Sequence, residues 1–584
     1  MARIVTRNLD WDNSRLPLEM PIVLRRIFAA RGVASIATLD LGLANLPLPD
    51  TLLDIDKAIS RLIDALVSNE KIIIIGDFDA DGATGTALML LGLRAMGFCY
   101  VDYMVPNRFE FGYGLTPEIV SLASKKNPDL LVTVDNGISS IEGVCFANER
   151  SIDVIITDHH LPGTELPDAY AIVNPNQDGC KFPSKNLAGV GVCFFVLIAL
   201  RASLRKRNWF LKKGLVEPNL ATWLDLVAMG TIADLVPLDH VNRILVQQGL
   251  VRLRAQKCRE GISALLRISG KQFKNLVAAD LGFALGPRIN AAGRLDDISL
   301  GIQCLITDDR QEALDLANEL DQLNQNRKKI EQDMHEEANT LLEELDPSKI
   351  ANSGGAICLF HADWHEGVVG LLASRVKDKY QRPVIAFARE RSDNDLMPKK
   401  SQLKGSCRSV PALHIRDALE AVSKRCPQLV NKFGGHAMAA GLTLDEANLE
   451  SFTQEFQSHV SQQLSFEDCE VVFETDGQLG VDELTQLTAE LLRDYGPWGQ
   501  NFPEPSFSGE FILEQQRVVG KNHLKLDLIH PDGTQHLNGI YFNMDKEKWP
   551  NYDAQRVNCV YRLTLNEFRG IQKLQLVIEY LETV

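Results

Sequence analysis

Three short acidic segments each follow an apolar run that predicts a buried β-strand. The segments are 77–82 (Asp-Phe-Asp-Ala-Asp-Gly), 135–137 (Asp-Asn-Gly) and 158–160 (Asp-His-His), and the runs before them are 71–75, 130–133 and 153–156. Continuous β-branched runs are typical of a parallel sheet covered on both faces, and such sheets bind ligands at the carboxyl ends of their strands. We therefore expect carboxylates and imidazoles to converge at one sheet edge, where their mutual repulsion favours bound cations.

The expected metal ligands are oxygens and one imidazole nitrogen. They are Asp77, Asp79, Asp81, Asp135, one histidine of the pair His159-His160, and Asp234 from the apolar segment 230–238. Carboxylates with imidazole and without thiolate suit Mn²⁺ or Mg²⁺ better than structural zinc. Two such ions about 4 Å apart can hold a bridging hydroxide and the leaving oxygen of a phosphoester, so two-metal hydrolysis is the predicted chemistry.

Each segment also has a plainer interpretation. The aspartate loop could be a calcium loop or a polar turn, although Leu88 stands where an EF-hand needs its last acidic ligand. Asp-Asn-Gly is a common turn, and Asp234 could cap a helix N-terminus. Adjacent histidines are more specific, because side chains of neighbouring residues at a strand end cannot both face the core. One of them could bind metal while the other faces a substrate phosphate, with Asp158 supporting an imidazole.

Composition limits the class of protein. At 584 residues the chain should form three or four domains, and its 45% apolar and 24% charged residues are ordinary for a soluble globular protein. No apolar stretch approaches the roughly 20 residues that span a bilayer, and the first residues lack a secretory signal. Eleven scattered cysteines without a Cys-x-x-Cys pair favour a reducing cytoplasm. The net charge of −16 argues against non-specific nucleic-acid binding, but a local basic groove would still permit it.

The predicted fold class is α/β: two α/β lobes joined by a long helix, followed by an all-β, OB-fold-like barrel. We expect a helical lead-in at 1–45, a doubly wound domain at 46–309, a connecting helix at 310–348, a second α/β lobe at 349–462 and the barrel at 463–584. Strands of the second lobe are expected at 355–360 and 383–387. Those of the barrel are expected at 510–515, 523–529, 537–542, 557–565 and 573–580.

The connecting helix carries an apolar stripe at near-heptad spacing. Its members are Leu316, Leu320, Leu323, Ile330, Met334, Leu341 and Leu345. The 36 residues from 310 to 345 would reach about 54 Å as one helix, which suits a rigid spacer between two lobes. A coiled-coil dimer is the alternative, but Arg327 should interrupt the stripe, so we expect a monomer.

Taken together, these motifs resemble those of the DHH phosphoesterases. The four segments containing Asp77–Gly82, Asp135–Gly137, Asp158–His160 and Gly230–Asp234 are joined by 286–295 (Gly-Pro-Arg-Ile-Asn-Ala-Ala-Gly-Arg-Leu). The second lobe contains 361–370, 405–409 and 433–441, which resemble a DHHA1 domain. With the terminal barrel, the resemblance extends over almost the whole chain to the bacterial RecJ family of single-strand-specific 5′→3′ DNA exonucleases.

The resemblance implies roles for individual residues. It implies metal binding by Asp79, Asp81, Asp135, His159 and Asp234, with Asp77 as a further ligand or a support of its loop. Catalytic roles fall on Asp135, His159 and His160, the last facing the scissile phosphate. Related pyrophosphatases carry a histidine where this chain has Ile75, so its first metal shell must differ from theirs.

The resemblance also implies that the second lobe closes over the active site and grips the terminal phosphate. The candidate substrate-binding residues are Arg288, Asn290, Ser374, Arg375, Arg408, Ser409, Gly434, Gly435 and His436. Arginine offers a planar fork of donors to phosphate oxygens, and the glycine pair would let the backbone approach closely. The alternative is that Arg375 and Arg408 are ordinary surface charges, which the small residues beside them make less attractive.

The barrel contains aromatic residues with lysines nearby, a combination that holds single strands by stacking. They are Phe507, Phe511, Tyr541, Phe542 and Tyr561, with Lys521, Lys525, Lys546 and Lys548. About half of these aromatic residues should belong to the core.

The predicted function is a cytoplasmic exonuclease that cuts single-stranded DNA from its 5′ end, releases 5′-mononucleotides and serves DNA repair and recombination. Its expected partners are single-stranded DNA with a 5′ end, a single-strand-binding protein and a repair helicase, with no membrane. One alternative is a DHH hydrolase of small substrates, which would not need the barrel. Another is a non-catalytic DNA-binding scaffold, which should have lost metal aspartates that this chain retains.

Overall fold

The computed structural model describes most of the chain, which divides into two compact units. The described residues are 2–8, 15–105, 114–344, 355–389, 402–465, 468, 470–520, 522–546, 548–568 and 571–584. One unit comprises Ile4–Asp321 together with Glu474–Val584, and the other comprises Gln322–Phe473 with the first three residues. Each unit is described separately below.

A parallel five-stranded sheet forms the centre of the first unit. Its strands are β3 (Val101–Met104), β2 (Ile72–Gly76), β4 (Leu130–Val134), β5 (Asp153–Thr157) and β6 (Ala171–Val173), in that spatial order. Every neighbouring pair is parallel. The three strands expected from apolar runs are therefore confirmed, and their carboxyl ends share one edge of the sheet.

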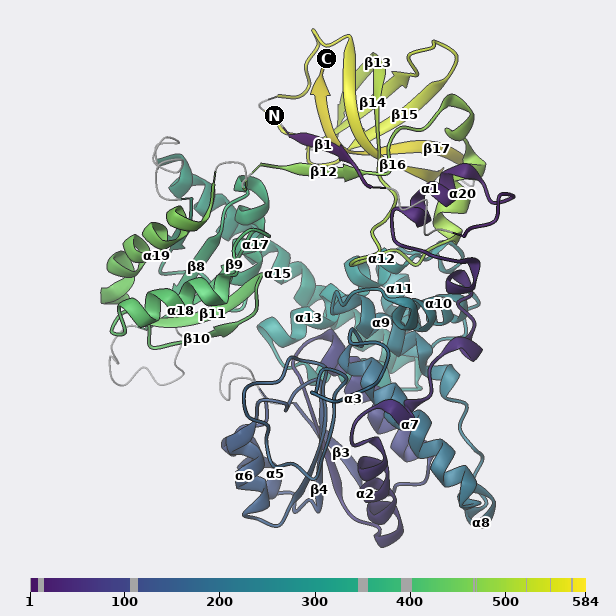
Figure 1. The fold of residues 1–584 in the computed structure, drawn as a ribbon, viewed down its shortest axis with the longest axis vertical. Helices are drawn as coiled ribbons and strands as arrows, with labels where there is room; N and C mark the ends of the chain where they lie inside the picture. Colours follow the sequence, from purple (N-terminus) through teal and green to yellow (C-terminus); the bar gives the residue numbers. More distant parts are fainter. Residues whose placement is uncertain are drawn as a thin grey trace. The chain divides into compact units, whose positions relative to one another are not determined.

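Helices cover both faces of this sheet, as continuous apolar strands require (Figure 1). On one face, α5 (Pro117–Ser124) and α6 (Ile141–Asn148) pack on a core that includes Ile73 and Ile156. The other face is covered by α2 (Ile55–Ser68), α3 (Ala80–Ala95) and α7 (Gly189–Lys206). Because α3 and α7 begin near the carboxyl ends of strands, their N-termini lie beside the acidic segments.

The rest of this part of the chain is helical. Its helices are α8 (Trp209–Lys213), α9 (Leu224–Ala233), α10 (His240–Arg254), α11 (Glu260–Ile268), α12 (Ala278–Asp280), α13 (Gly286–Leu295) and α14 (Ser299–Ile306). A π-helical turn at Leu281–Leu285 precedes α13. Helices α3 and α9 pack against each other, which brings the end of α9 toward the predicted metal ligands at the start of α3.

The lead-in is less uniformly helical than expected. It contains β1 (Arg3–Thr6), which pairs with β12 (Val472–Thr475), then α1 (Ile22–Ala29) and short 3₁₀ turns. The guanidinium of Arg31, at the end of α1, forms two hydrogen bonds of 2.7 and 3.0 Å with the buried carboxylate of Asp476. The lead-in is thus fastened to the segment that introduces the barrel.

The long helix α15 extends over Arg310–Glu344, as the periodicity predicts. Its buried face differs from the expected stripe, because Leu316, Leu323 and Ile330 are only half-buried. The buried positions are Ala313, Ala317, Leu320, Asn324, Arg327, Met334 and Ala338. Arg327 interrupts the apolar stripe, as expected, because its guanidinium lies on the buried face and pairs with Glu331 at 2.8 Å. The side chain of Leu341 and all of Leu345 lie outside the described residues.

The second unit contains a mixed five-stranded sheet in the order β10-β11-β9-β8-β7. The strands are β7 (Ile357–Phe360), β8 (Val384–Arg389), β9 (Gln402–Arg408), β10 (Lys432–Gly435) and β11 (Ala439–Asp445), and the helices are α17 (Val369–Tyr380), α18 (Ile415–Arg425) and α19 (Leu449–Gln463). Only β7 and β8 pair in parallel. The two strands expected here are confirmed.

A closed five-stranded barrel ends the chain, preceded by α20 (Gln486–Asp494). Its strands are β13 (Phe507–Val519), β14 (His523–Ile529), β15 (His536–Tyr541), β16 (Arg556–Phe568) and β17 (Ile571–Thr583), which confirms all five expected strands. Phe507, Phe511 and Tyr561 are buried in its core, whereas Phe542 is 51% exposed. Lys521 lies outside the described residues.

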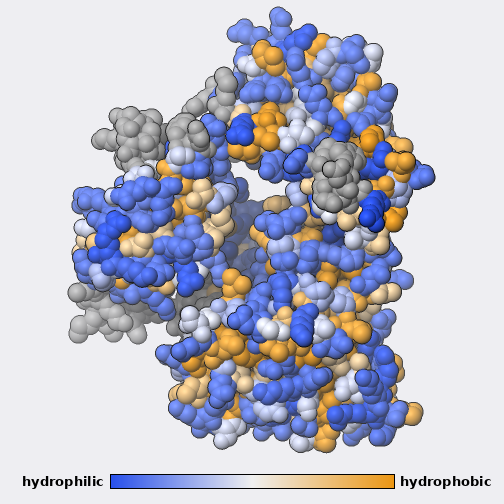
Figure 2. Space-filling view, viewed as in Figure 1, coloured by the Kyte–Doolittle hydropathy of each residue, from blue (hydrophilic) through white to orange (hydrophobic). Residues whose placement is uncertain are grey.

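Side chains on the visible surface are mostly hydrophilic, and hydrophobic residues are dispersed among them in small patches (Figure 2). Among the described residues, none of the helices combines the length and apolar character needed to cross a bilayer.

Candidate metal centre

The loop after β2 holds the first group of carboxylates. Asp79 is the N-cap of α3, and its Oδ1 accepts hydrogen bonds from the backbone N–H groups of Asp81 (2.9 Å) and Gly82 (3.0 Å). A Cβ atom on Gly82 would lie 2.5 Å from the Asp77 carbonyl oxygen, so only glycine permits this tight turn. The turn therefore places Asp77, Asp79 and Asp81 at the carboxyl edge of the sheet.

Asp81 is fully buried and is held by the N-terminus of α7. Its two carboxylate oxygens accept from the N–H groups of Gly189 (2.6 Å) and Val190 (3.0 Å). A Cβ on Gly189 would lie 2.6 Å from the Cβ of Asp135, so glycine is needed for the helix to approach both aspartates. The helix N-terminus favours the ionised carboxylate at this position.

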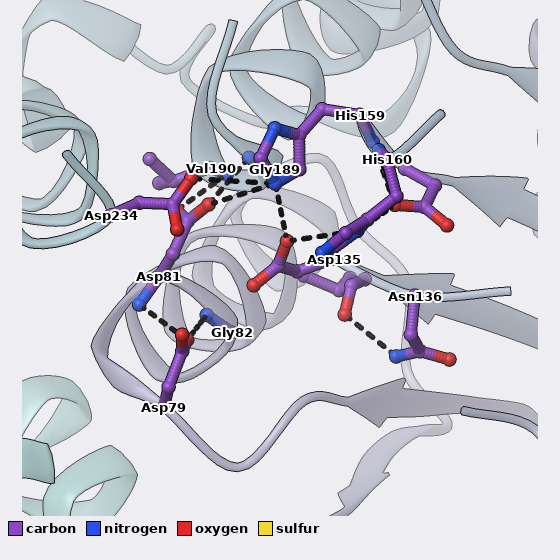
Figure 3. A network of polar contacts seen from close by, with 12 residues as sticks. Asp79, Asp81, Gly82, Asp135, Asn136, His159, His160, Gly189, Val190 and Asp234 are labelled. Carbon is purple, nitrogen blue, oxygen red and sulfur yellow. Dashed lines mark hydrogen bonds and ion pairs between the residues drawn. The ribbon is translucent and has the colours of Figure 1, made fainter. Parts of the chain in front are cut away.

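Asp135 follows β4 in a left-handed backbone conformation, with φ of +63°. The neighbouring Asn136 is buried, and its side-chain amide donates to the carbonyls of Ile75 (3.1 Å) and Val134 (2.9 Å). These bonds join the ends of β2 and β4 just behind Asp135. The strained turn is thereby fixed so that the Asp135 carboxylate points toward α3 and α7 (Figure 3).

Asp158 organises the histidine pair that follows β5. It is buried, and its Oδ1 accepts from the N–H groups of His159 (2.7 Å) and His160 (3.1 Å) and lies 2.7 Å from Nδ1 of His160. Its Oδ2 accepts from the N–H of Ile138 at 2.9 Å. Asp158 therefore supports both histidines instead of projecting toward the other carboxylates.

His159 is where the separated segments meet (Figure 3). Its Nε2 lies 3.0 Å from Oδ1 of Asp135, 3.4 Å from Oδ2 of Asp234 and 4.0 Å from Oδ2 of Asp81. Three sets of ligand atoms each lie within 4.8 Å of one another: Asp135 with His159 and His160, Asp81 with His159 and Asp234, and Asp77 with Asp79 and Asp135. All six predicted metal ligands are thus brought together.

The crowded carboxylates resist ionisation. Burial and the charge of Asp79 raise the pKa of Asp81 to about 7, and burial with the charges of Asp81 and Asp79 raises the pKa of Asp135 well above its usual range. Burial and Asp81 act on the pKa of Asp234 in the same direction. Groups placed so that they repel one another fit a site whose charge is neutralised by bound cations.

The histidine pair shows the opposite balance. Burial alone would lower the pKa of His160, but the hydrogen bond and charge of Asp158 outweigh it and raise the pKa to about 9. Burial would raise the pKa of Asp158, but the bond to His160 lowers it. His160 is therefore cationic at neutral pH in the metal-free chain and is suited to an anionic substrate group.

The donor set fits a pair of hard divalent cations. Carboxylate oxygens and the ring nitrogens of His159 and His160 surround the centre, and no cysteine belongs to the three ligand sets found among the described residues. Asp234 caps the C-terminal end of α9, so the alternative that it caps a helix N-terminus is wrong. Ile75 is fully buried within β2, so the position that carries histidine in the pyrophosphatases belongs here to the apolar core.

Two predicted substrate residues of the first unit contact other parts of the protein. The guanidinium of Arg288 donates to Asp321 Oδ1 at 2.8 Å and also bonds the Ala284 carbonyl. The side-chain oxygen of Asn290 accepts from the N–H of Ala80 at 2.7 Å, in the first turn of α3. Arg288 thus forms an intramolecular ion pair, and Asn290 binds the aspartate loop.

The two predicted arginines of the second lobe have different surroundings. Arg408 donates to the hydroxyls of Ser374 (3.0 Å) and Ser406 (3.3 Å), and Arg375 pairs instead with Glu331 at 3.1 Å. Among the described residues no carboxylate pairs with Arg408, whose pKa burial lowers. A partly buried guanidinium surrounded by hydroxyls is suited to an anion.

Ser409 and His436 each bind a backbone carbonyl of the same lobe. The buried Ser409 donates its hydroxyl to the Leu413 carbonyl at 2.7 Å, and the N–H of His436 donates to the Ala439 carbonyl at 2.8 Å. Gly435 has φ of +142° and no room for a Cβ beside Ala440, whereas a Cβ on Gly434 would meet nothing within 4 Å. Gly434 is therefore the member of the pair that leaves its backbone approachable.

Sequence reasoning missed the groups that position the ligands. These are the backbone N–H groups of Gly189 and Val190, and the side chains of Asn174 and Asn176, which donate to the carbonyls of His160 (2.9 Å) and His159 (2.6 Å). Small residues at the beginning of the apolar run 189–200 were a signal for close helix approach. The polar cluster 174–177 directly after β6, at the same sheet edge as the other motifs, was another.

Comparisons with known proteins agree with this architecture. The DHH family, N-terminal domain, matches residues 71–231, the DHHA1 domain matches 352–462, and the RecJ OB domain matches 475–580. The chain is 52% identical over 575 residues to the single-stranded-DNA-specific exonuclease RecJ of Dickeya dadantii, covering 98% of each chain. The chain belongs to the RecJ family. It is also 51% identical to RecJ of Escherichia coli, again over 98% of each chain.

Solved structures of the RecJ family show the same fold. RecJ from Thermus thermophilus in complex with Mn²⁺ superposes with a TM-score of 0.80 at 29% identity, covering 100% of this chain and 79% of that one. The complex of the Thermus thermophilus protein with Mg²⁺ gives a TM-score of 0.74 at 28% identity. The predicted fold class, with two α/β lobes and a terminal barrel, is therefore confirmed, and so is the prediction of Mn²⁺ or Mg²⁺ as the cofactor.

Proposed function

We propose that this chain is a metal-dependent exonuclease that hydrolyses the phosphodiester bonds of single-stranded DNA from the 5′ end and releases 5′-mononucleotides. The single observation that carries the proposal is the convergence of aspartates from three separate segments on His159, with the three ligand sets each within 4.8 Å. The membership of the chain in a family named for single-stranded-DNA-specific exonucleases supports the choice of substrate. A role in DNA repair and recombination follows from that activity.

In this proposal Asp77, Asp79, Asp81, Asp135, His159 and Asp234 hold the divalent ions. The ions, when bound, supply an activated water and neutralise charge on the scissile phosphate. Asp135 occupies the middle of the site, because its carboxylate belongs to two of the three ligand sets. His160 is held as a cation by Asp158 and contacts the scissile phosphate.

Binding of the strand uses groups outside the metal centre. Arg408, with the hydroxyls of Ser374 and Ser406, forms an anion-binding site in the second lobe for a phosphate of the strand. On the barrel, Phe542 is exposed and packs edge-on against His523 at 5.2 Å between ring centroids. An exposed aromatic ring of this kind is suited to base stacking.

The proposal extends to the setting of the enzyme. We place it in the cytoplasm as a monomer that cooperates with a single-strand-binding protein and a repair helicase. Its catalytic domain is 46–309, its connecting helix 310–348, its DHHA1 domain 349–462 and its nucleic-acid-binding barrel 463–584, after a lead-in at 1–45.

Digestion of end-labelled DNA tests the activity and its direction. With Mn²⁺ present, a 5′-labelled single strand should lose its label at once as mononucleotide, whereas a 3′-labelled strand should shorten progressively. A blunt duplex should persist, and excess chelator should stop the reaction. Retreat from the 3′ end, or equal digestion of the duplex, would overturn the proposal. Preferred cleavage of dinucleotides or polyphosphate would instead favour the small-substrate alternative.

A further inference from the structure

The segment that carries the two histidines has no regular secondary structure, yet side chains bind the backbone N–H and carbonyl groups of both histidines. The N–H groups of His159 and His160 both donate to Asp158, as described above. The His159 carbonyl accepts from the side-chain amide of Asn176 at 2.6 Å, and the His160 carbonyl accepts from that of Asn174 at 2.9 Å. The backbone on both sides of each imidazole is therefore fixed by groups outside a helix or strand.

The two asparagines are themselves linked. Asn174 is fully buried, and its Oδ1 accepts from the N–H of Asn176 at 2.7 Å, which holds the turn after β6 in place. Because β6 pairs with β5, this turn lies beside the end of the strand from which the histidines follow. The side chains of Asn174 and Asn176 therefore hold the carbonyls of the two histidines at a fixed distance from the turn that follows β6.

A third amide, that of Asn290, binds the backbone of the aspartate loop, but as a hydrogen-bond acceptor and not as a donor. Asn290 of α13 accepts, through Oδ1, the N–H of Ala80 at 2.7 Å. A Cβ on Gly293, one helical turn later, would lie 2.0 Å from the Phe78 carbonyl oxygen, so α13 lies directly against this loop. Ala80 separates Asp79 from Asp81, and the bond therefore fixes the backbone between two predicted ligands.

Amides have a physical advantage at this position. A lysine or arginine could make the same bonds to carbonyls, but its charge would compete with the divalent cations for the carboxylates. An amide supplies a donor and an acceptor without charge and without titration. Neighbouring groups that orient metal ligands typically contribute tenfold to a hundredfold in metal affinity.

We infer that Asn174, Asn176 and Asn290 are positioning residues that hold the metal-ligand loops in their binding geometry, and that Asn290 acts in this way instead of contacting DNA. The inference rests on the proposed function, because it assumes that these loops bind divalent ions. It assigns a donor role to Asn176 and an acceptor role to Asn290.

Isosteric substitutions separate the two roles. Asn176→Asp replaces the donor with a carboxylate oxygen facing the His159 carbonyl, so Mn²⁺ affinity measured by titration calorimetry should fall about tenfold to a hundredfold. Asn290→Asp keeps an acceptor for the Ala80 N–H, so its Mn²⁺ affinity should stay within about threefold of wild type, whereas Asn290→Ala should lose about tenfold. Added negative charge alone would instead tighten cation binding in both aspartate variants.

Asn148→Asp is the matched control. Its amide donates to the Asp168 carbonyl at 2.9 Å, but it lies at the end of α6, away from the carboxyl edge of the sheet. This variant should bind Mn²⁺ like wild type. Thermal unfolding of the chelated proteins checks folding, and Asn176→Ala replaces Asn176→Asp if the latter does not fold.

A spectroscopic readout distinguishes positioning from general damage. Pulsed electron paramagnetic resonance of wild type saturated with Mn²⁺ should detect a nitrogen coupling from His159, and this coupling should weaken or change in Asn176→Ala but persist in Asn290→Asp. Unchanged affinity and coupling in both Asn176 variants would overturn the inference. Failure of the wild type itself to bind Mn²⁺ would instead overturn the proposed function.

Discussion

The metal centre and the Arg408 site bury groups of opposite charge. At the centre, buried aspartates lie so close together that their pKa values rise, with that of Asp81 reaching about 7. In the second lobe, a partly buried guanidinium lies among hydroxyls, and burial lowers its pKa. Each region bears an unfavourable charge that a ligand of the opposite sign would relieve: cations in the first case and a phosphate in the second.

The two regions also differ in how their side chains are held. The aspartates depend on backbone groups from distant segments, such as the N-terminus of α7, whereas Arg408 is held by hydroxyls on its own strand and on α17. Loss of a central carboxylate should therefore abolish the chemistry. Loss of the arginine should weaken binding of the strand while leaving the chemistry possible.

The largest effect is expected for Asp135→Asn. Asparagine tolerates the left-handed φ of this position, so the turn should persist, but the central ligand is lost. Metal-assisted stabilisation is worth several kcal/mol, so cleavage of single-stranded DNA should fall about a thousandfold or more. Single-turnover digestion in Mn²⁺ measures this. Retention of more than a tenth of the wild-type rate would contradict the central place given to Asp135.

Arg408→Ala should have the next largest effect. A charge-assisted hydrogen bond to phosphate is worth about 1.5–3 kcal/mol, so kcat/KM should fall about tenfold to a hundredfold. Arg408→Lys should recover only part of it, because the planar fork is lost. Arg389→Ala is the control, since Arg389 ends the adjacent strand β8 but is exposed and paired with Glu446. Equal losses in the two alanine variants would indicate general electrostatics and not a specific site.

These expectations show what the sequence could predict. The strands and the four acidic segments were recognisable because apolar runs and turn residues are local signals, and parallel strands bring their carboxyl ends together. The extent of α15 could likewise be predicted from its local sequence. Its buried face could not, because Asn324 and Arg327 are buried and hydrogen-bonded to each other, and a search for apolar spacing overlooks such polar residues.

The surroundings of the site residues depend on contacts between distant segments. Arg288 stays a predicted phosphate ligand, and the sequence did not reveal that Asp321, 33 residues away, binds its guanidinium. Asn174 and Asn176 were overlooked because their partners are backbone carbonyls, which every residue has and no motif marks. Residue type identifies the chemistry that a side chain could perform. The role of these side chains depends on which distant segment the fold places beside them.

Asp158→Asn should change the pH profile by a smaller factor. Without the carboxylate, the pKa of His160 should fall from about 9 toward its ordinary 6.5. His160 is cationic below its pKa, so activity that needs this cation should be lost at lower pH in the variant. The alkaline limb of kcat/KM should shift by about two pH units, a decrease of about 25-fold at pH 8.5 and little change at pH 6. His160→Gln should remove this limb altogether, and an unshifted limb in Asp158→Asn would assign it to another group.

The smallest effect, on stability, tests the comparison most directly. In the folded protein the pKa of Asp135 lies well above the ordinary value of 3.8 expected for the unfolded chain. The unfolded chain therefore releases this proton at a lower pH than the folded protein does. As a result, Asp135 lowers the free energy of unfolding as the pH rises above about 4. In chelator, Asp135→Asn should therefore unfold at a temperature a few degrees above wild type at pH 8, and the difference should shrink toward pH 4. Added Mn²⁺ should raise the unfolding temperature of wild type more than that of the variant, because a ligand stabilises only the state that binds it.

Arg408→Ala, by contrast, should leave the effect of Mn²⁺ on the unfolding temperature unchanged. If instead wild type and Asp135→Asn unfold together at every pH, Asp135 is already compensated within the protein, and the crowding of charge at the centre does not by itself require cations.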